Sequence, residues 1–183
     1  MDGWNVDRTV PFGSVEYLFF VLLVVFGRAA DLFSTWVATP TLELEANPIA
    51  KWLGWRGGVW VNLVVAVVVA LLPLAAISVA TTSVLVAARN LQSAWLVRVL
   101  GEHEYRMWIA ARYRETRPGV FLVCLVMHAG LIALVGAGLM SFSGWRLVPF
   151  GVGFGIVVYA LAVVLFTGIS MRRAAREIGR AHV

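Results

Sequence analysis

The chain has 183 residues, of which 61% are hydrophobic and 14% are charged, and its mean hydropathy is +0.86. This composition excludes an ordinary soluble globular domain and indicates a protein that lies in a lipid bilayer. The net charge of +5 is not accompanied by a nucleic-acid recognition motif, so we expect the arginines to reflect membrane topology and not binding to nucleic acid.

Four apolar stretches are long enough to cross the apolar core of a bilayer, which takes about 20 residues per helix. They cover residues 15–38, 58–88, 119–140 and 147–170. The longest remaining segment, 89–118, is too short and too amphipathic to form a soluble domain. We therefore predict one all-α membrane domain over residues 1–183, built as a bundle of four helices.

Lys and Arg residues are distributed unevenly between the two sides that four spans would define. The side with both termini and segment 89–118 holds eleven arginines, whereas the other side holds only Lys51, Arg56 and Arg146. Because positively charged loops stay on the cytoplasmic side, we expect a multi-pass protein of the cell membrane with both termini in the cytoplasm.

The first predicted span, 15–38, ends in a polar patch. Arg28, Asp31 and Thr35 lie within about 60° of one another around the helix axis. Ser34 lies at the edge of this sector. A charged side chain at the centre of a membrane helix costs about 2.5–3.5 kcal/mol even on the lenient insertion scale, and such charges mark functional sites by default. The patch is therefore expected to face other helices or a wet cavity.

More polar residues follow in the predicted extracytoplasmic segment 39–58. Asn47 is a good helix cap and Pro48 is a good first helical residue, so we predict a short helix at the outer membrane interface. Glu45 lies near the positive end of this helix. Asn62 lies about one turn into the second predicted span, from which it can approach the patch on the first span.

The second predicted span, 58–88, starts at the glycine pair 57–58, which should end the short outer helix. At about 1.5 Å per residue this span would be about 46 Å long, so the helix must tilt or project from the apolar core. Pro73 removes one backbone hydrogen bond near the middle, and we expect a kink there.

The first third of the chain contains DLFST at 31–35, at the end of the first span, and EANP at 45–48, before the second. This pattern resembles a family of small prokaryotic multi-pass membrane proteins of unknown function. The resemblance implies a compact helical bundle and implies no activity. The residues that it groups together are Asp31, Thr35, Glu45, Asn47 and Pro48.

Residues 89–118 carry basic and apolar faces, which predicts amphipathic helices on the cytoplasmic surface of the membrane. The alternative is a docking surface for a partner protein. Glu102, His103 and Glu104 are consecutive, so they point in directions about 100° apart and do not chelate one metal ion by themselves. We predict no metal site.

The last two predicted spans carry small residues at intervals of four, the spacing that lets membrane helices approach closely or lets two copies of a protein pair. These residues are Ala129, Ala133 and Ala137 in one span and Gly151 and Gly155 in the other. His128 is a candidate hydrogen-bond partner between helices or a proton carrier. The single cysteine, Cys124, excludes an intrachain disulfide.

The residues that we predict to meet at one ligand-binding site are Arg28, Asp31, Ser34, Thr35, Glu45, Asn47 and Asn62. Their carboxylates, amides and hydroxyls around one guanidinium suit an ion, a lipid headgroup or a small polar solute. We therefore expect a protein that binds or conducts such a ligand, or an accessory subunit of a membrane complex. The structural alternative is that Arg28 and Asp31 only neutralise each other.

An intramembrane enzyme acting on a lipid-linked substrate is the second class of function. The chain lacks a histidine-rich metal set, a nucleophile elbow and a phosphate-binding glycine loop, which disfavours an enzyme. The sequence names no cofactor. The partners that we expect are the lipid bilayer and either a second copy of the chain, as a homo-oligomer, or another membrane protein.

Overall fold

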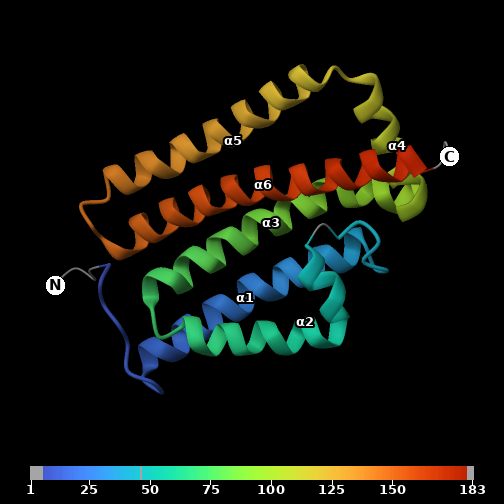
Figure 1. Cartoon of the computed structure of the whole chain (residues 1–183). Helices are drawn as coiled ribbons and strands as arrows, with labels where there is room; N and C mark the ends of the chain where they lie inside the picture. Colours follow the sequence, from blue (N-terminus) through green and yellow to red (C-terminus); the bar gives the residue numbers. More distant parts are fainter. Residues whose placement is uncertain (1–5, 46, 181–183) are drawn as a thin grey trace.

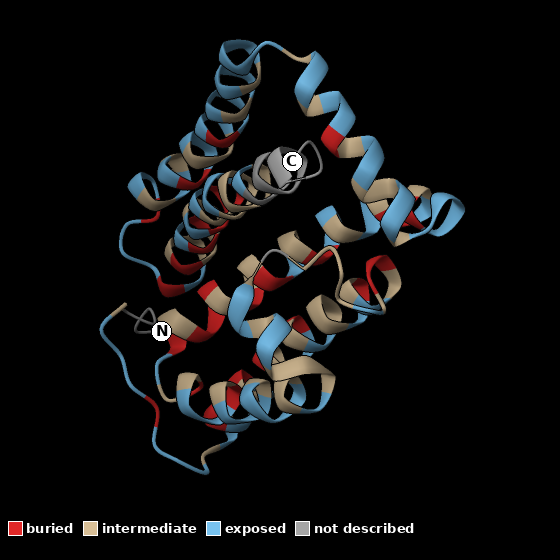
Figure 2. Ribbon diagram, turned by 45° about the vertical axis from the view of Figure 1, so that its right-hand side comes forward, coloured by how far each residue is buried: buried red, intermediate tan, exposed pale blue. Residues whose placement is uncertain are grey.

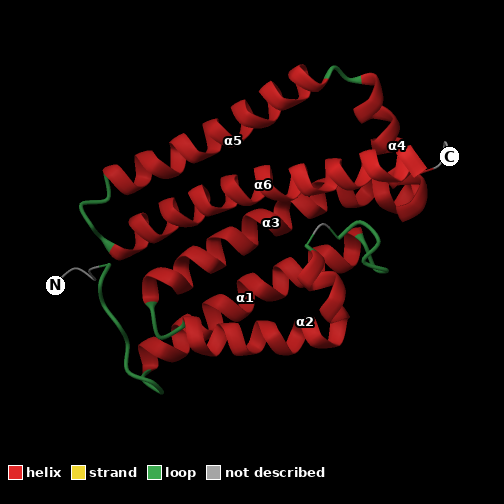
Figure 3. Cartoon of the chain, in the orientation of Figure 1, coloured by secondary structure: helices red, strands yellow, loops and turns green. Residues whose placement is uncertain are grey.

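The computed structural model describes residues 6–45 and 47–180, with side chains described as far as residue 172. Within these residues the regular structure is entirely helical (Figure 1, Figure 3). The helices are α1 (Val15–Ala38), α2 (Pro48–Val69), α3 (Pro73–Leu100), α4 (Glu102–Glu115), α5 (Pro118–Ser141) and α6 (Leu147–Arg180). Among them, α1, α2, α3, α5 and α6 are long and apolar enough to cross a membrane.

The predicted single span over residues 58–88 is wrong, because two helices and a turn occupy this region. α2 ends at Val69, residues 70–72 form a turn, and α3 begins at Pro73. Leu72 has the extended backbone (φ −117°, ψ 93°) that a residue before proline prefers, so Pro73 starts a helix and does not kink one. The described residues therefore contain five long apolar helices where we expected four.

α1 and α2 are antiparallel neighbours along nearly the whole length of α1. Near one end, the Tyr17 hydroxyl donates a hydrogen bond to the Val67 carbonyl oxygen at 3.0 Å. Near the other end, the indole N–H of Trp55 donates to the Pro40 carbonyl oxygen at 2.9 Å. α2 therefore covers the same depth as α1, as expected of a helix that crosses the membrane beside it.

α3 lies at the centre of the bundle, between α1 and α6, and α5 packs against α6 (Figure 1). The backbones of α1 and α3 approach closely at Gly27, where an added Cβ would lie 2.9 Å from the Cα of Ala80. On the other side of α3, the Ser78 hydroxyl donates to the carbonyl oxygen of Gly151 on α6 at 3.1 Å. Small residues thus let both neighbours approach the central helix.

α5 packs on α6 through a stripe that differs from the predicted one. Ala129 is buried, but Ala137 is exposed. The closest approach is at Gly136, where an added Cβ would lie 2.6 Å from the carbonyl oxygen of Gly153 on α6. Each interval of four residues turns about 40° around a helix, so two intervals rotate Ala137 out of the contact, whereas an interval of seven keeps Gly136 in it.

Figure 2 shows that burial is concentrated where the helices meet. The main apolar cluster joins the first half of α1 to the α2–α3 turn and the start of α6, and it includes Phe20, Val24 and Leu147. Large apolar side chains are exposed on the outer faces of α2 and α5, as at Trp60 (71%) and Leu134 (69%). Outer faces of this kind suit contact with lipid.

The short helix predicted after Asn47 forms, but it ends earlier than expected. Asn47 caps it by accepting a backbone N–H at 3.0 Å, and Pro48 occupies its first turn, as predicted. The break lies at Gly54, whose positive φ of 61° favours glycine. The predicted break at the pair 57–58 is therefore wrong.

The two ends of the bundle gather different segments (Figure 1). The segment from Val6, the turn at 70–72 and the loop at 142–146 lie at one end, whereas residues 39–45, α4 and the end of α6 lie at the other, which we call the α4 end. Glu102 at the start of α4 contacts residues 39–43 directly. These two connecting segments therefore share one end, although four spans would have placed them on opposite sides.

Candidate functional site

Arg28 on α1 is the centre of the polar contacts among α1, α2 and α3. Its Nη1 donates to Asp31 Oδ2 at 2.8 Å and to Ser83 Oγ on α3 at 3.1 Å. Its Nε donates to Asn62 Oδ1 on α2. The Asn62 amide is oriented for this contact, because its Nδ2 donates to the Gly58 carbonyl oxygen at 2.7 Å. One guanidinium therefore joins three helices.

The ion pair at the centre of these contacts is mostly withdrawn from the surface. The side chains of Arg28 and Asp31 are 28% and 16% exposed, and Ser83 is 1% exposed. A charge in such surroundings is tolerable only with hydrogen-bonded partners, because desolvation costs several kcal/mol per ion. We call Arg28, Asp31, Asn62 and Ser83 the Arg28 site.

Ser34 and Thr35 lie one turn further along α1 and contact a different residue of α3. The Asn90 side-chain amide donates to Ser34 Oγ at 3.2 Å and to Thr35 Oγ1 at 3.1 Å. The Ser34 hydroxyl in turn donates to the backbone carbonyl oxygen of Asp31 at 2.8 Å. Polar contacts therefore continue from the Arg28 site toward the α4 end, along the line where α1 meets α3.

Glu45 and Asn47 have different positions relative to this site. The Glu45 carboxylate lies near enough to Asp31 to interact with it electrostatically. The Asn47 backbone N–H donates to Glu45 Oε1 at 2.7 Å, whereas the Asn47 side chain is used to cap α2. Asn47 thus positions Glu45 and does not contribute its amide to the Arg28 site.

Two contributors on α3, Ser83 and Asn90, were not among the predicted residues. They are seven positions apart, so they lie on one face of α3, as do the buried residues Ala80 and Ala87. That spacing is visible in the sequence. It was missed because the predicted second span ended at 88 and separated Asn90 from Ser83.

Glu102 anchors the loop between α1 and α2 at the α4 end of the bundle. Its carboxylate accepts the Thr39 hydroxyl and the backbone N–H groups of Thr41 (3.0 Å) and Glu43 (3.2 Å). Burial by itself raises the pKa of the Glu102 carboxyl, but these hydrogen bonds stabilise the charged form more, so its pKa lies below the ordinary glutamate value. The loop that carries Glu45 is therefore anchored by a charged group.

Glu43 adds a second attachment between the same loop and α4. Its Oε1 lies 3.4 Å from Arg106 Nη2 and 3.6 Å from His103 Nδ1. Of the consecutive residues 102–104, Glu102 and His103 thus contact the loop. Among the described residues no group of three or more His, Cys, Asp and Glu side chains is arranged to hold a metal ion.

His128 and Cys124 lie apart from these contacts, on exposed faces of α5. The predicted role of His128 in bonding to a neighbouring helix of the same chain is not seen in the part of the chain that the structure describes. Both side chains are instead exposed on the surface of α5.

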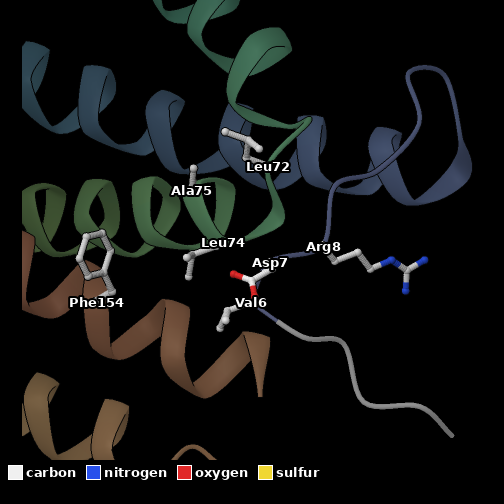
Figure 4. Close-up of a pocket in the computed structure, with 7 residues that line it drawn as sticks. All are labelled: Val6, Asp7, Arg8, Leu72, Leu74, Ala75 and Phe154. Atoms are coloured by element: carbon white, nitrogen blue, oxygen red, sulfur yellow. The ribbon is translucent and has the colours of Figure 1, made fainter. Parts of the chain in front are cut away.

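Two hollows on the described surface lie at the end of the bundle opposite to α4. The first has a volume of about 240 Å³, and Asp7 points toward it whereas Arg8 points away (Figure 4). Its lining residues are Val6, Asp7, Arg8, Leu72, Leu74, Ala75 and Phe154. The second, of about 350 Å³, is lined by the end of α5, the loop after it and the start of α6, through Met140, Ser141, Gly144, Trp145 and Phe150. Neither hollow includes a residue of the Arg28 site.

Comparison with known proteins does not place the chain in a family. The resemblance carried by DLFST and EANP therefore stays a prediction. Neither protein-family models, nor curated proteins, nor solved structures gave a match to this chain.

Proposed function

We propose that this chain is a multi-pass membrane protein that binds or conducts a small polar ligand at the Arg28 site, and that this ligand is an ion, a lipid headgroup or a small solute. The observation that carries the proposal is one guanidinium bonded to groups from three helices, beside the Asp31 carboxylate and within electrostatic range of Glu45. Carboxylate and amide oxygens are the usual ligands of hard cations. A lipid headgroup or a small solute would use the same groups.

The structural alternative is that Arg28 and Asp31 only neutralise each other. Neutralisation of Arg28 alone would need only one carboxylate, and Asp31, three residues further along the same helix, supplies it. The site also draws on Asn62 and Ser83 from two other helices and has Glu45 nearby on an anchored loop. This convergence favours a binding role, either in a protein acting alone or in an accessory subunit of a membrane complex.

An enzyme acting on a lipid-linked substrate would need a substrate-sized hollow beside its acid and base groups. The two hollows described above include no residue of the Arg28 site, so neither supplies a substrate site there. We keep binding as the proposal and an enzyme acting on a lipid-linked substrate as the alternative.

We infer that the α4 end faces the cytoplasm and that the segment from Val6 faces the opposite side of the cell membrane. Five crossings, unlike four, place the two ends of a chain on opposite sides. Of the fifteen Lys and Arg residues, twelve belong to segments at or nearest the α4 end, Arg8 and Arg146 belong to the other end, and Arg28 lies inside α1. The positive-inside rule then assigns the α4 end to the cytoplasm.

Thermal unfolding of the full chain in mild detergent, across a panel of Na⁺, K⁺, Mg²⁺, Ca²⁺ and lipid headgroups, tests the binding role. We expect one ligand of this panel to raise the melting temperature, with a stabilisation of about 2.7 kcal/mol at a hundredfold excess over Kd. Glu45→Gln and the double variant Arg28→Met with Asp31→Leu should both remove this shift. Glu16→Gln should retain it, because Glu16 pairs with Arg8 at the other end of the bundle.

The same measurement without ligand tests the structural alternative. Asp31→Leu alone should destabilise the protein by about 3–5 kcal/mol, because it leaves Arg28 charged and unpaired, whereas the double variant should be near neutral. If the wild-type melting temperature responds to nothing in the panel while this stability pattern holds, the ion pair is structural and the proposed binding role is rejected.

A further inference from the structure

The contact between α5 and α6 is close at one end and open at the other. On α5, Leu122, Ala129 and Gly136 recur at intervals of seven and so share one stripe. Gly136 and Ala129 are buried against α6, but Leu122 is 58% exposed. Along this single stripe, packing is therefore lost toward the start of α5.

The facing stripe of α6 changes in the same direction. Gly153 lies against Gly136, and Ala160, two turns further along, is 2% exposed. Val164, one turn beyond Ala160, is 37% exposed, and a Cβ added at Gly168 would meet nothing within 4 Å. In Figure 1 the ribbons of α5 and α6 diverge toward α4. We call the space between residues 118–128 of α5 and 164–171 of α6 the α5–α6 wedge.

Polar groups from three helices lie at the wide end of this wedge. Arg89 of α3 donates through Nη2 to the Thr167 hydroxyl of α6 at 3.1 Å. Tyr105 and Tyr113 of α4 both lie within electrostatic range of Arg89. The ring of Tyr113 meets Phe121 of α5 edge to face, with centroids 5.0 Å apart. α3, α4, α5 and α6 therefore all meet around one exposed guanidinium.

The depth of these groups matches that of a lipid headgroup. At 1.5 Å per residue, Arg89 lies about 24 Å from the start of α3 and Thr167 about 30 Å from the start of α6. The apolar core of a bilayer is about 30 Å thick, so both residues lie near its boundary at the α4 end. The wedge itself extends from there into the apolar layer. Most of its side chains are Leu, Val, Ile, Met and Phe, and besides Thr167 the polar ones are His128 and Ser170.

Charge decides which kind of headgroup fits. No carboxylate pairs with Arg89 in the described part of the chain, and Arg guanidinium is well suited to phosphate oxygens. Burial raises the pKa of both Tyr105 and Tyr113, and the Tyr105 side chain is hydrogen-bonded to Ser93. One cation beside the hydroxyls of Thr167 and Tyr113 suits an anionic phosphate.

We propose that the α5–α6 wedge binds a phospholipid with an anionic headgroup, whose phosphate lies against Arg89 and Thr167 and whose acyl chains lie between α5 and α6. This site is separate from the Arg28 site and does not depend on the function proposed there. The wedge accepts acyl chains because most of its side chains are apolar and lie at membrane depth.

Native mass spectrometry of the gently solubilised full chain, with equal amounts of phosphatidylglycerol and phosphatidylcholine, tests this site. We expect the wild type to retain phosphatidylglycerol in preference. Arg89→Gln should abolish the preference, and Arg89→Lys should preserve part of it. Arg114→Gln is the matched control, because Arg114 is exposed on α4, and it should retain the full preference.

A second variant tests the walls of the wedge without touching its charged end. Val164→Trp should fill the space and lower the retention of both lipids, with a melting temperature like that of the wild type. Equal lipid retention in wild type and Arg89→Gln, or undiminished retention in Val164→Trp, would overturn the proposal. A wild-type dimer without lipid would also overturn it, because a second copy of the chain would then fill the wedge.

Discussion

At the scale of single residues, Glu102 shows how one carboxylate can position a distant group. It contacts neither Arg28 nor Asp31 in the described contacts, yet it accepts three hydrogen bonds from residues 39–43. This loop leads directly to Glu45, which lies within electrostatic range of Asp31. Loss of the Glu102 charge should therefore loosen the loop that brings Glu45 toward the site.

We expect the contribution of Glu102 to stability to depend on pH. Its pKa is lower in the folded chain than in the unfolded chain, so protonation favours unfolding. The stabilisation is complete above the ordinary glutamate value of about 4.3 and is lost as the pH falls through the lower folded value. Melting temperatures measured from pH 7 to pH 3 should therefore converge for wild type and Glu102→Gln.

The control for this measurement is Glu115→Gln on the same helix. Glu115 pairs with Arg112 at 2.6 Å, but both side chains are about 60% exposed, so its removal should change little at any pH. A difference in melting temperature between wild type and Glu102→Gln that stays the same from pH 7 to pH 3 would contradict the role given to Glu102.

Local backbone context decided which predicted polar residues reach Arg28. Asn62 lies inside a helix, where the neighbouring backbone N–H groups are already bonded, so its Oδ1 is available to Arg28. Asn47 precedes a helix, and its side chain is consumed as the cap that the sequence itself predicts. The convergence of Arg28 with Asn62 was thus predictable. Ser83 was missed because the predicted second span ended at 88, which separated Ser83 from Asn90 on the same face of α3.

At the scale of elements, the packing of α5 on α6 rests on a backbone contact between two glycines. Gly136→Ala should destabilise the protein by about 1–3 kcal/mol, the usual cost of overpacking, because its Cβ would lie 2.6 Å from the Gly153 carbonyl oxygen. Gly138→Ala is the matched control, since a Cβ there meets nothing within 4 Å. Thermal unfolding in detergent should separate the two variants, and equal effects would refute this contact.

The boundaries of helices were predictable wherever polar residues or prolines mark them. α1 begins and ends at the predicted residues, and α5 begins and ends within one residue of the prediction. The turn at 70–72 was missed because residues 63–77 are uniformly apolar, so hydropathy has no minimum there. Only Pro73 and the excessive length of a single span indicated that two helices were present.

At the scale of the whole molecule, the five crossings that we propose would reverse the side of the membrane that four spans assign to every segment before the turn at 70–72. Four spans would place the connection between α1 and α2 outside the cell, but five place it with α4, and Glu102 bonds to it there. Charge supports the same arrangement, because Lys51 and Arg56 then join the arginine-rich end. The orientation is therefore testable with single cysteines at positions where the two topologies disagree.

We expect an impermeant thiol reagent to label Leu72→Cys and Phe142→Cys in intact cells, in a background where Cys124 is replaced by Ala. Both positions are exposed at the end opposite to α4, at 51% and 93%. Thr41→Cys and Glu104→Cys should react only after the membrane is permeabilised. Thr41 is the decisive position, because four spans would place it outside the cell and five place it in the cytoplasm. Labelling of Thr41→Cys in intact cells, together with protection of Leu72→Cys, would show that α2 and α3 are not separate crossings.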